Sequence, residues 1–202
     1  MKYIIEHMEQ GFTEWVTLEY CQIIRDVGKD NLILTSLPGQ IKEDDIPLCL
    51  REMGLNWTTK DTTEFLDLNT AKLCLLDPRA EIDLQPADKL KFDYFVFGGI
   101  LGDHPPRDRT SELKHKLGCE TRRLGHLQMT TDTAVRTTKL IVEGTKFEDI
   151  KFIDYPEIRY NIHEATEMPF RYVLNDQNEP ILPEGMLNLI KKDSEKTLDD
   201  FF

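Results

Sequence analysis

The residues best suited to chemistry stand where short apolar runs give way to glycines and carboxylates. One apolar run ends at Phe97 and continues as GGILGD over residues 98–103. Glycines let a ligand approach the backbone closely, and Asp103 adds a negative charge beside them. The run lacks the Gly-Lys-Ser/Thr ending of a P-loop and is not a complete Gly-x-Gly-x-x-Gly motif. It predicts a small-molecule site, with a tight strand-to-helix turn as the alternative.

Two other stretches have the same character. Residues 122–134 read RRLGHLQMTTDTA, which is extended chain, then a glycine-containing loop, then the start of a helix. Helix N-terminal amides and the hydroxyls of Thr131 and Thr133 can hold a polar ligand, or one of the threonines can simply cap the helix. The third stretch is another strand end, at Leu76 and Asp77. In open α/β sheets, ligands bind at the carboxyl ends of strands.

The elements that must position these residues alternate between strands and helices. Apolar runs predict strands at residues 2–6, 32–35, 72–76 and 93–97, with extended chain at 120–124. Helical spacing and end signals predict a helix that Thr13 caps and that runs to Val27, and others at 43–53, 110–117 and 131–143. This alternation predicts an α/β fold with a mostly parallel sheet.

The length of 202 residues fits one domain, which we assign to residues 1–150. Prolines divide the remainder into short pieces before a last predicted helix at 184–192. Residues 151–202 are therefore expected to form an acidic extension that wraps the core. The chain has no apolar run long enough to span a membrane and no secretory signal at its N-terminus, so we expect a cytoplasmic protein.

The net charge of the chain and its distribution indicate which kinds of molecule the protein can bind. The formal net charge is −12, which disfavours stable, sequence-independent binding of nucleic acid. Within this acidic chain, residues 107–123 hold six basic and three acidic residues. We call this segment the basic island. The pattern suits a small anionic group bound locally and a basic partner bound broadly.

The runs FGGILGDHPPRDRT at 97–110 and LGHLQMTTD at 124–132, with the strand end at Asp77, resemble the SPOUT superfamily of S-adenosylmethionine-dependent methyltransferases. Within it they are most similar to the fungal SPOUT-type protein arginine methyltransferases. The resemblance implies helices on both faces of the sheet, a deep C-terminal trefoil knot and S-adenosylmethionine as cofactor. It also implies monomethylation of an arginine in a basic ribosomal protein of the small subunit. An RNA methyltransferase of the same fold and a non-catalytic binding module are the alternatives.

The resemblance also implies a site. The expected cofactor contacts come from three loops: Leu76, Asp77, Gly98, Gly99, Ile100, Gly102, Leu124, His126, Leu127, Met129, Thr131 and Thr133. A carboxylate would offset the repulsion between two positively charged reactants. Asp103 is the first candidate, Asp77 the second and Glu19 the third, with Asp132 a weaker one. Each carboxylate has a surface or capping role as its alternative.

The substrate is expected to contact Asp103, Arg107 and Trp15. Arg122 and Arg123 are further candidates for an anionic group, with solvated surface charges as the alternative. His104 and His126 have no regular ligand spacing, so we expect no metal. The superfamily is mostly homodimeric, but we expect a monomer here because the acidic extension would cover the dimer face.

Overall fold

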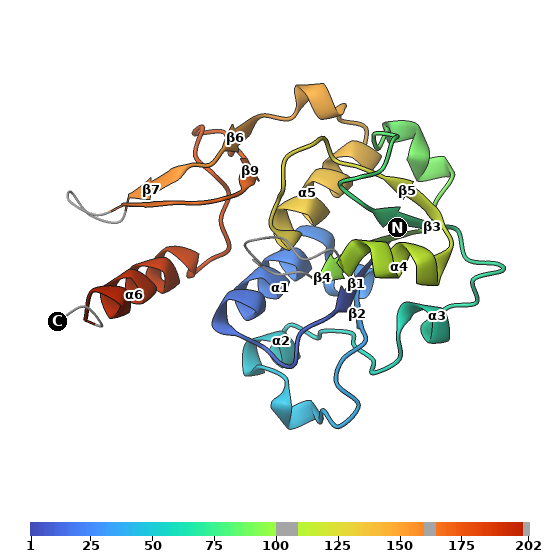
Figure 1. The fold of residues 1–202 in the computed structure, drawn as a ribbon, viewed down its shortest axis with the longest axis horizontal. Helices are drawn as coiled ribbons and strands as arrows, with labels where there is room; N and C mark the ends of the chain where they lie inside the picture. Colours follow the sequence, from blue (N-terminus) through green and yellow to red (C-terminus); the bar gives the residue numbers. More distant parts are fainter. Residues whose placement is uncertain (100–108, 160–164, 200–202) are drawn as a thin grey trace.

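The computed structural model describes residues 1–99, 109–159 and 165–199. Its centre is a sheet of five strands: β1 (Lys2–His7), β2 (Leu32–Thr35), β3 (Leu73–Leu76), β4 (Tyr94–Gly99) and β5 (Glu120–Arg122). The strand order is β2-β1-β4-β3-β5, and every neighbouring pair is parallel (Figure 1). The predicted α/β fold with a mostly parallel sheet is therefore confirmed. The trefoil knot stays a prediction.

Helices cover both faces of the sheet, because successive strand residues point to opposite sides. The described helices are α1 (Glu14–Val27), α2 (Leu48–Glu52), α3 (Thr62–Phe65), α4 (Arg109–Leu117), α5 (Thr131–Val142) and α6 (Met186–Asp199). On one face, Ile5 packs in a cluster with residues of α1 and α5. On the other, Ile4 packs with Leu113 and Leu117 of α4. None of the described helices has the length and apolar content to cross a bilayer.

The helix predicted at 43–53 is wrong as a continuous element. The structure has a 3-10 turn, Glu43–Asp45, followed by the short helix α2. Pro47 separates them, because proline has no N–H and disfavours helical geometry in the residue before it. Ile46 is accordingly extended, with ψ of 129°.

The chain after residue 150 lies at one end of the molecule (Figure 1). Its strands are β6 (Phe152–Asp154), β7 (Glu157–Arg159), β8 (Ala165–Glu167) and β9 (Arg171–Val173), paired as β6-β9 and β7-β8. An apolar cluster joins this region to α1, with Tyr172 and Ile190 from the extension packed near Trp15 and Leu18. The last helix begins two residues later than predicted and continues to Asp199.

Gly99 fixes how closely β4 approaches β1. A Cβ atom at this position would lie 2.7 Å from the Glu6 carbonyl oxygen, so the two strands would have to separate. We expect Gly99→Ala to lower the free energy of unfolding by about 1–3 kcal/mol, measured by urea denaturation. Gly11→Ala is the matched control, since a Cβ there meets nothing within 4 Å. Equal stabilities of the two variants would contradict this interpretation.

Candidate active site

A cavity of about 370 Å³ opens at the carboxyl ends of β3, β4 and β5, beside the first turn of α5. This size lies in the range of small-molecule sites. Its lining comes from the strand ends, the loop after β5, and helices α4 and α5: Leu76, Asp77, Pro78, Arg79, Phe97, Gly98, Thr110, Leu124, Gly125, His126, Leu127, Gln128, Met129, Thr131 and Ala134. The walls combine apolar side chains with a few polar groups, as an adenosine-containing ligand requires.

The three predicted stretches meet in this cavity. The predicted cofactor residues that line it are Leu76, Asp77, Gly98, Leu124, His126, Leu127, Met129 and Thr131. Two predicted residues do not line it. Gly99 packs against β1, and the Thr133 hydroxyl is buried 2.8 Å from the Thr130 hydroxyl.

Ile100, Gly102, Asp103 and Arg107, which were also predicted for the site, lie outside the described residues.

Sequence reasoning missed several lining residues, and some of them carried a usable signal. Ala134 follows Thr131 by three positions on α5, so the two share a helix face. Pro78 and Arg79 directly follow the predicted strand end at Asp77. Thr110 is the last residue of the run at 97–110 that carries the family resemblance, so that run marked it too.

Asp77 is a buried carboxylate in the cavity wall, with 4% of its surface exposed. Its Oδ1 accepts a hydrogen bond of 2.9 Å from the backbone N–H of Arg79, and its Oδ2 lies 3.8 Å from Lys114 Nζ. Its backbone N–H donates to the Arg122 carbonyl, which continues the β3–β5 pairing. One residue therefore shapes the turn after β3 and places a negative charge in the cavity.

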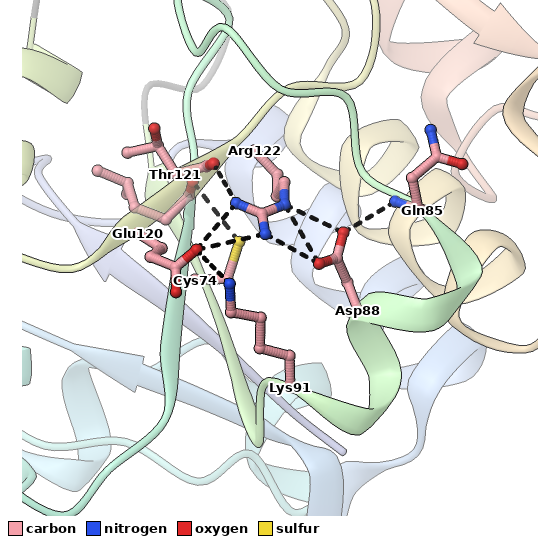
Figure 2. A network of polar contacts seen from close by, with 8 residues as sticks. Cys74, Gln85, Asp88, Lys91, Glu120, Thr121 and Arg122 are labelled. Atoms are coloured by element: carbon pink, nitrogen blue, oxygen red, sulfur yellow. Dashed lines mark hydrogen bonds and ion pairs between the residues drawn. The ribbon is translucent and has the colours of Figure 1, made fainter.

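Arg122 is part of a buried ion-pair network and does not line the cavity (Figure 2). Its Nη2 lies 3.0 Å from Asp88 Oδ1 and its Nη1 donates to the Thr121 carbonyl at 2.9 Å. Glu120 joins the same guanidinium to Lys91 Nζ, which lies 2.6 Å from Glu120 Oε2. The network ties β5 to the 3-10 helix Pro86–Leu90 and so holds the loop that begins at Leu124.

Glu19, Asp132 and Trp15 lie outside the cavity lining, between α1 and α5. Glu19 and Asp132 are fully buried, and Glu19 Oε1 accepts a 2.7 Å hydrogen bond from Trp15 Nε1. Neither carboxylate has the surface role that was its alternative. Among residues 1–99, 109–159 and 165–199, no group of three His, Cys, Asp or Glu side chains could hold a metal ion.

A parallel five-stranded sheet, covered on both faces and carrying a cavity at its carboxyl edge, gives the protein an open α/β fold of the ligand-binding type. A Trm10 structure from Thermococcus kodakaraensis shows this fold at 21% identity and a TM-score of 0.54, covering 74% of this chain and 96% of its own.

A family model, protein arginine N-methyltransferase SFM1-like, matches residues 2–197. The chain belongs to this SFM1-like family. It is 66% identical over 210 residues to protein arginine N-methyltransferase SFM1 of Saccharomyces cerevisiae, covering 99% of both chains. The structure of yeast SFM1 complexed with SAM matches at 65% identity and a TM-score of 0.90, over 96% of this chain and 91% of that one. The yeast enzyme complexed with SAH matches at 64% identity and a TM-score of 0.87, over 94% of each.

Proposed function

We propose that this protein transfers a methyl group from S-adenosylmethionine (SAM) to an arginine of a basic small-subunit ribosomal protein, giving monomethylarginine. The observation that carries the proposal is the cavity at the strand ends, built from the two sequence runs that mark the family. A relative at 65% identity that binds SAM supports the choice of cofactor. Leu76, Leu124 and Met129 would pack the adenine, and the Thr131 hydroxyl and the strand-end backbone would bond its polar edge.

SAM supplies an electrophilic methyl group on a positively charged sulfur. The new bond joins that carbon to a guanidinium nitrogen, the carbon–sulfur bond breaks with its electron pair left on sulfur, and the guanidinium loses one proton. Both reactants are cations, which at 4 Å repel by about 4 kcal/mol at an effective dielectric of 20. The buried Asp77 carboxylate in the cavity wall offsets part of this repulsion. Asp103, which lies outside the described residues, remains our first candidate for the same role.

The charges of the molecule favour a protein substrate over RNA. The net charge is −12, and four cations in the described part of the basic island are paired with carboxylates. Within it, Lys116 pairs with Asp61 at 2.7 Å and Arg123 pairs with Asp83 at 2.6 Å. Lys114 and Arg122 are engaged with Asp77 and Asp88. Cations already paired with carboxylates release few counterions from a phosphate backbone.

Tritiated SAM tests the proposal directly. Incubation of the purified protein with small ribosomal subunits should label one basic protein, and acid hydrolysis should release monomethylarginine. Label in ribosomal RNA with none in protein would replace the proposal by RNA methylation. Absence of SAM binding in a calorimeter would favour a non-catalytic module.

We further propose that the protein works as a monomer in the cytoplasm. The extension supports a monomer, because its apolar residues cover Trp15 and Leu18 of α1. Light scattering should give a mass near 23.6 kDa. A mass of twice this value would establish a dimer.

A further inference from the structure

Three buried polar side chains meet where α1, α5 and β9 pack together. They are Glu19 of α1, Asp132 in the first turn of α5 and Tyr172 of β9. Glu19 and Asp132 are 0% exposed and Tyr172 is 1% exposed. Full burial of two carboxylates beside a phenol is unusual, because charged groups are expensive to remove from water unless they are paired.

Most of the polar atoms in this group lack a well-formed hydrogen bond. Within the described part of the chain, Glu19 Oε2, both carboxylate oxygens of Asp132 and the Tyr172 hydroxyl form no hydrogen bond of good geometry. The Thr130 hydroxyl and the Thr133 N–H lie close enough to Asp132 to lower its pKa, and the Thr131 N–H does the same for Glu19. The indole N–H of Trp15 satisfies only the other oxygen, Glu19 Oε1. Buried polar atoms of this kind are explained by a ligand, a bound water or ion, or stored strain.

The nearby cation does not neutralise the group. Arg136, one helical turn beyond Asp132 on α5, is buried, and its Nη2 lies 2.7 Å from Asp26 Oδ2 on α1. Its charge is therefore divided between Asp26, with which it pairs, and Asp132, whose pKa it lowers. A buried charge without a partner strongly destabilises the folded protein. A ligand that supplies a cation to these carboxylates would therefore be bound favourably.

Titration behaviour agrees with this geometry. Burial, followed by the charge of Asp132, raises the pKa of Glu19 well above its usual range. Burial also raises the pKa of Asp132 to about 6. The pKa of Tyr172 is raised by burial and then by the charges of both carboxylates, so the three groups are close enough to interact.

We propose that Glu19, Asp132 and Tyr172 form the subsite that binds the guanidinium of the substrate arginine. This inference rests on the proposed function. A guanidinium carries five N–H donors and no acceptor, and the group offers acceptor oxygens from two carboxylates and one hydroxyl, four of which form no hydrogen bond of good geometry. Two carboxylates on different helices can accept hydrogen bonds from two sides of the planar guanidinium. A lysine ammonium lacks this planar arrangement of donors.

The subsite adjoins the cofactor cavity. Thr131 and Ala134 line the cavity, and Asp132 directly follows Thr131 on α5 but points from another face of the helix. We place the entrance at Trp15, because this ring is half-buried while the Glu19 carboxylate it contacts is fully buried. An incoming side chain would replace the indole at Glu19 Oε1 and could stack on the ring.

Calorimetry with matched peptides tests the subsite. The probes are a lysine-rich peptide with a single arginine and the same peptide with citrulline, which has the same shape without the charge. In the presence of saturating SAH, we expect the wild-type protein to bind the arginine peptide at least tenfold more tightly than the citrulline peptide. Glu19→Gln and Asp132→Asn should reduce this ratio to near one, and Tyr172→Phe should reduce it partly.

Glu143→Gln is the control, because Glu143 is an exposed carboxylate at the other end of α5, paired with Lys139 at 2.8 Å. It should keep the wild-type ratio, and all variants should keep wild-type affinity for SAH. If the wild-type protein methylates arginine but Glu19→Gln and Asp132→Asn discriminate as well as it does, the subsite is wrong and the function stands. If the wild-type protein neither binds SAM nor methylates, the function is wrong and the subsite with it.

A thermal readout separates binding from a merely structural role. Folding raises the pKa of Asp132 to about 6, so the stability contributed by its proton is present at low pH and is lost as pH rises from about 4 to 6. The charged groups facing Asp132 are Arg136 on its own helix and Glu19 and Asp26 on α1, with Tyr172 on β9. Asp132→Asn should therefore melt a few degrees above the wild-type protein at pH 7 and level with it at pH 4. A lower melting temperature at pH 7 would assign Asp132 to structure and overturn the subsite.

Discussion

Leucine in place of Ala134 is expected to weaken SAM binding at least 100-fold, about 2.7 kcal/mol. Ala134 lines the cavity of about 370 Å³ from one side of α5, where it is half-buried. The leucine side chain would occupy space that the adenosine needs, and packed protein walls give way only at a cost. Alanine and leucine both favour helices, so α5 itself should form normally. Calorimetric titration with SAM measures the change.

Ala134→Ser is the matched control, since it adds one small atom and should change the affinity less than tenfold. Melting curves of both variants should stay close to that of the wild-type protein. Unchanged SAM affinity in the leucine variant would mean that the cofactor binds elsewhere. That result would rule out the cavity as the cofactor site, and the proposed function would lose its structural basis.

Arg122→Ala is expected to lower the free energy of unfolding by about 3–5 kcal/mol, because it leaves the Asp88 carboxylate buried without its cation. The two side chains are 6% and 9% exposed, so water cannot replace the lost charge. For a chain of this size the melting temperature should fall by about 10 °C. Scanning calorimetry and urea denaturation measure the two quantities.

The double variant Arg122→Met with Asp88→Asn provides the control for this prediction. It removes both charges and keeps an oxygen for the Gln85 N–H, which donates to Asp88 Oδ2 at 2.9 Å. We expect the double variant to be more stable than Arg122→Ala, because the stability effects of substituting both residues of one ion pair are not additive. A loss below 1 kcal/mol for Arg122→Ala alone would show that the network in Figure 2 contributes little.

Local chemistry in the sequence was enough to predict the sheet and its two main helices. Thr13 caps α1 as expected, its Oγ1 accepting from the Val16 N–H at 3.2 Å, and Gly28 ends the helix with φ of 83°. The apolar runs predicted β1 to β3 within one residue at each end, and β4 within two. Such elements are predictable because their signals lie within a few neighbouring residues.

Features that depend on distant residues were not predictable in this way. The three-residue strands after residue 150 are too short to show alternation, and only their pairing defines them. Asp132 meets Tyr172 through tertiary packing alone. The sequence marked the three loops of the site, but it could not separate Gly98, which lines the cavity, from Gly99, which packs on β1.

The position of β1 in the sheet has a consequence for synthesis. β1 pairs with β4 in a register that joins Lys2 to Tyr94. At translation rates of roughly 5–20 residues per second, β4 follows β1 by roughly 5–20 s. During this interval the apolar side chains of Ile4 and Ile5, fully buried in the finished sheet, have α1 and β2 available to pack against but not β4. Folding should therefore be slow for a chain of this size, because the central pairing closes a loop of about 90 residues.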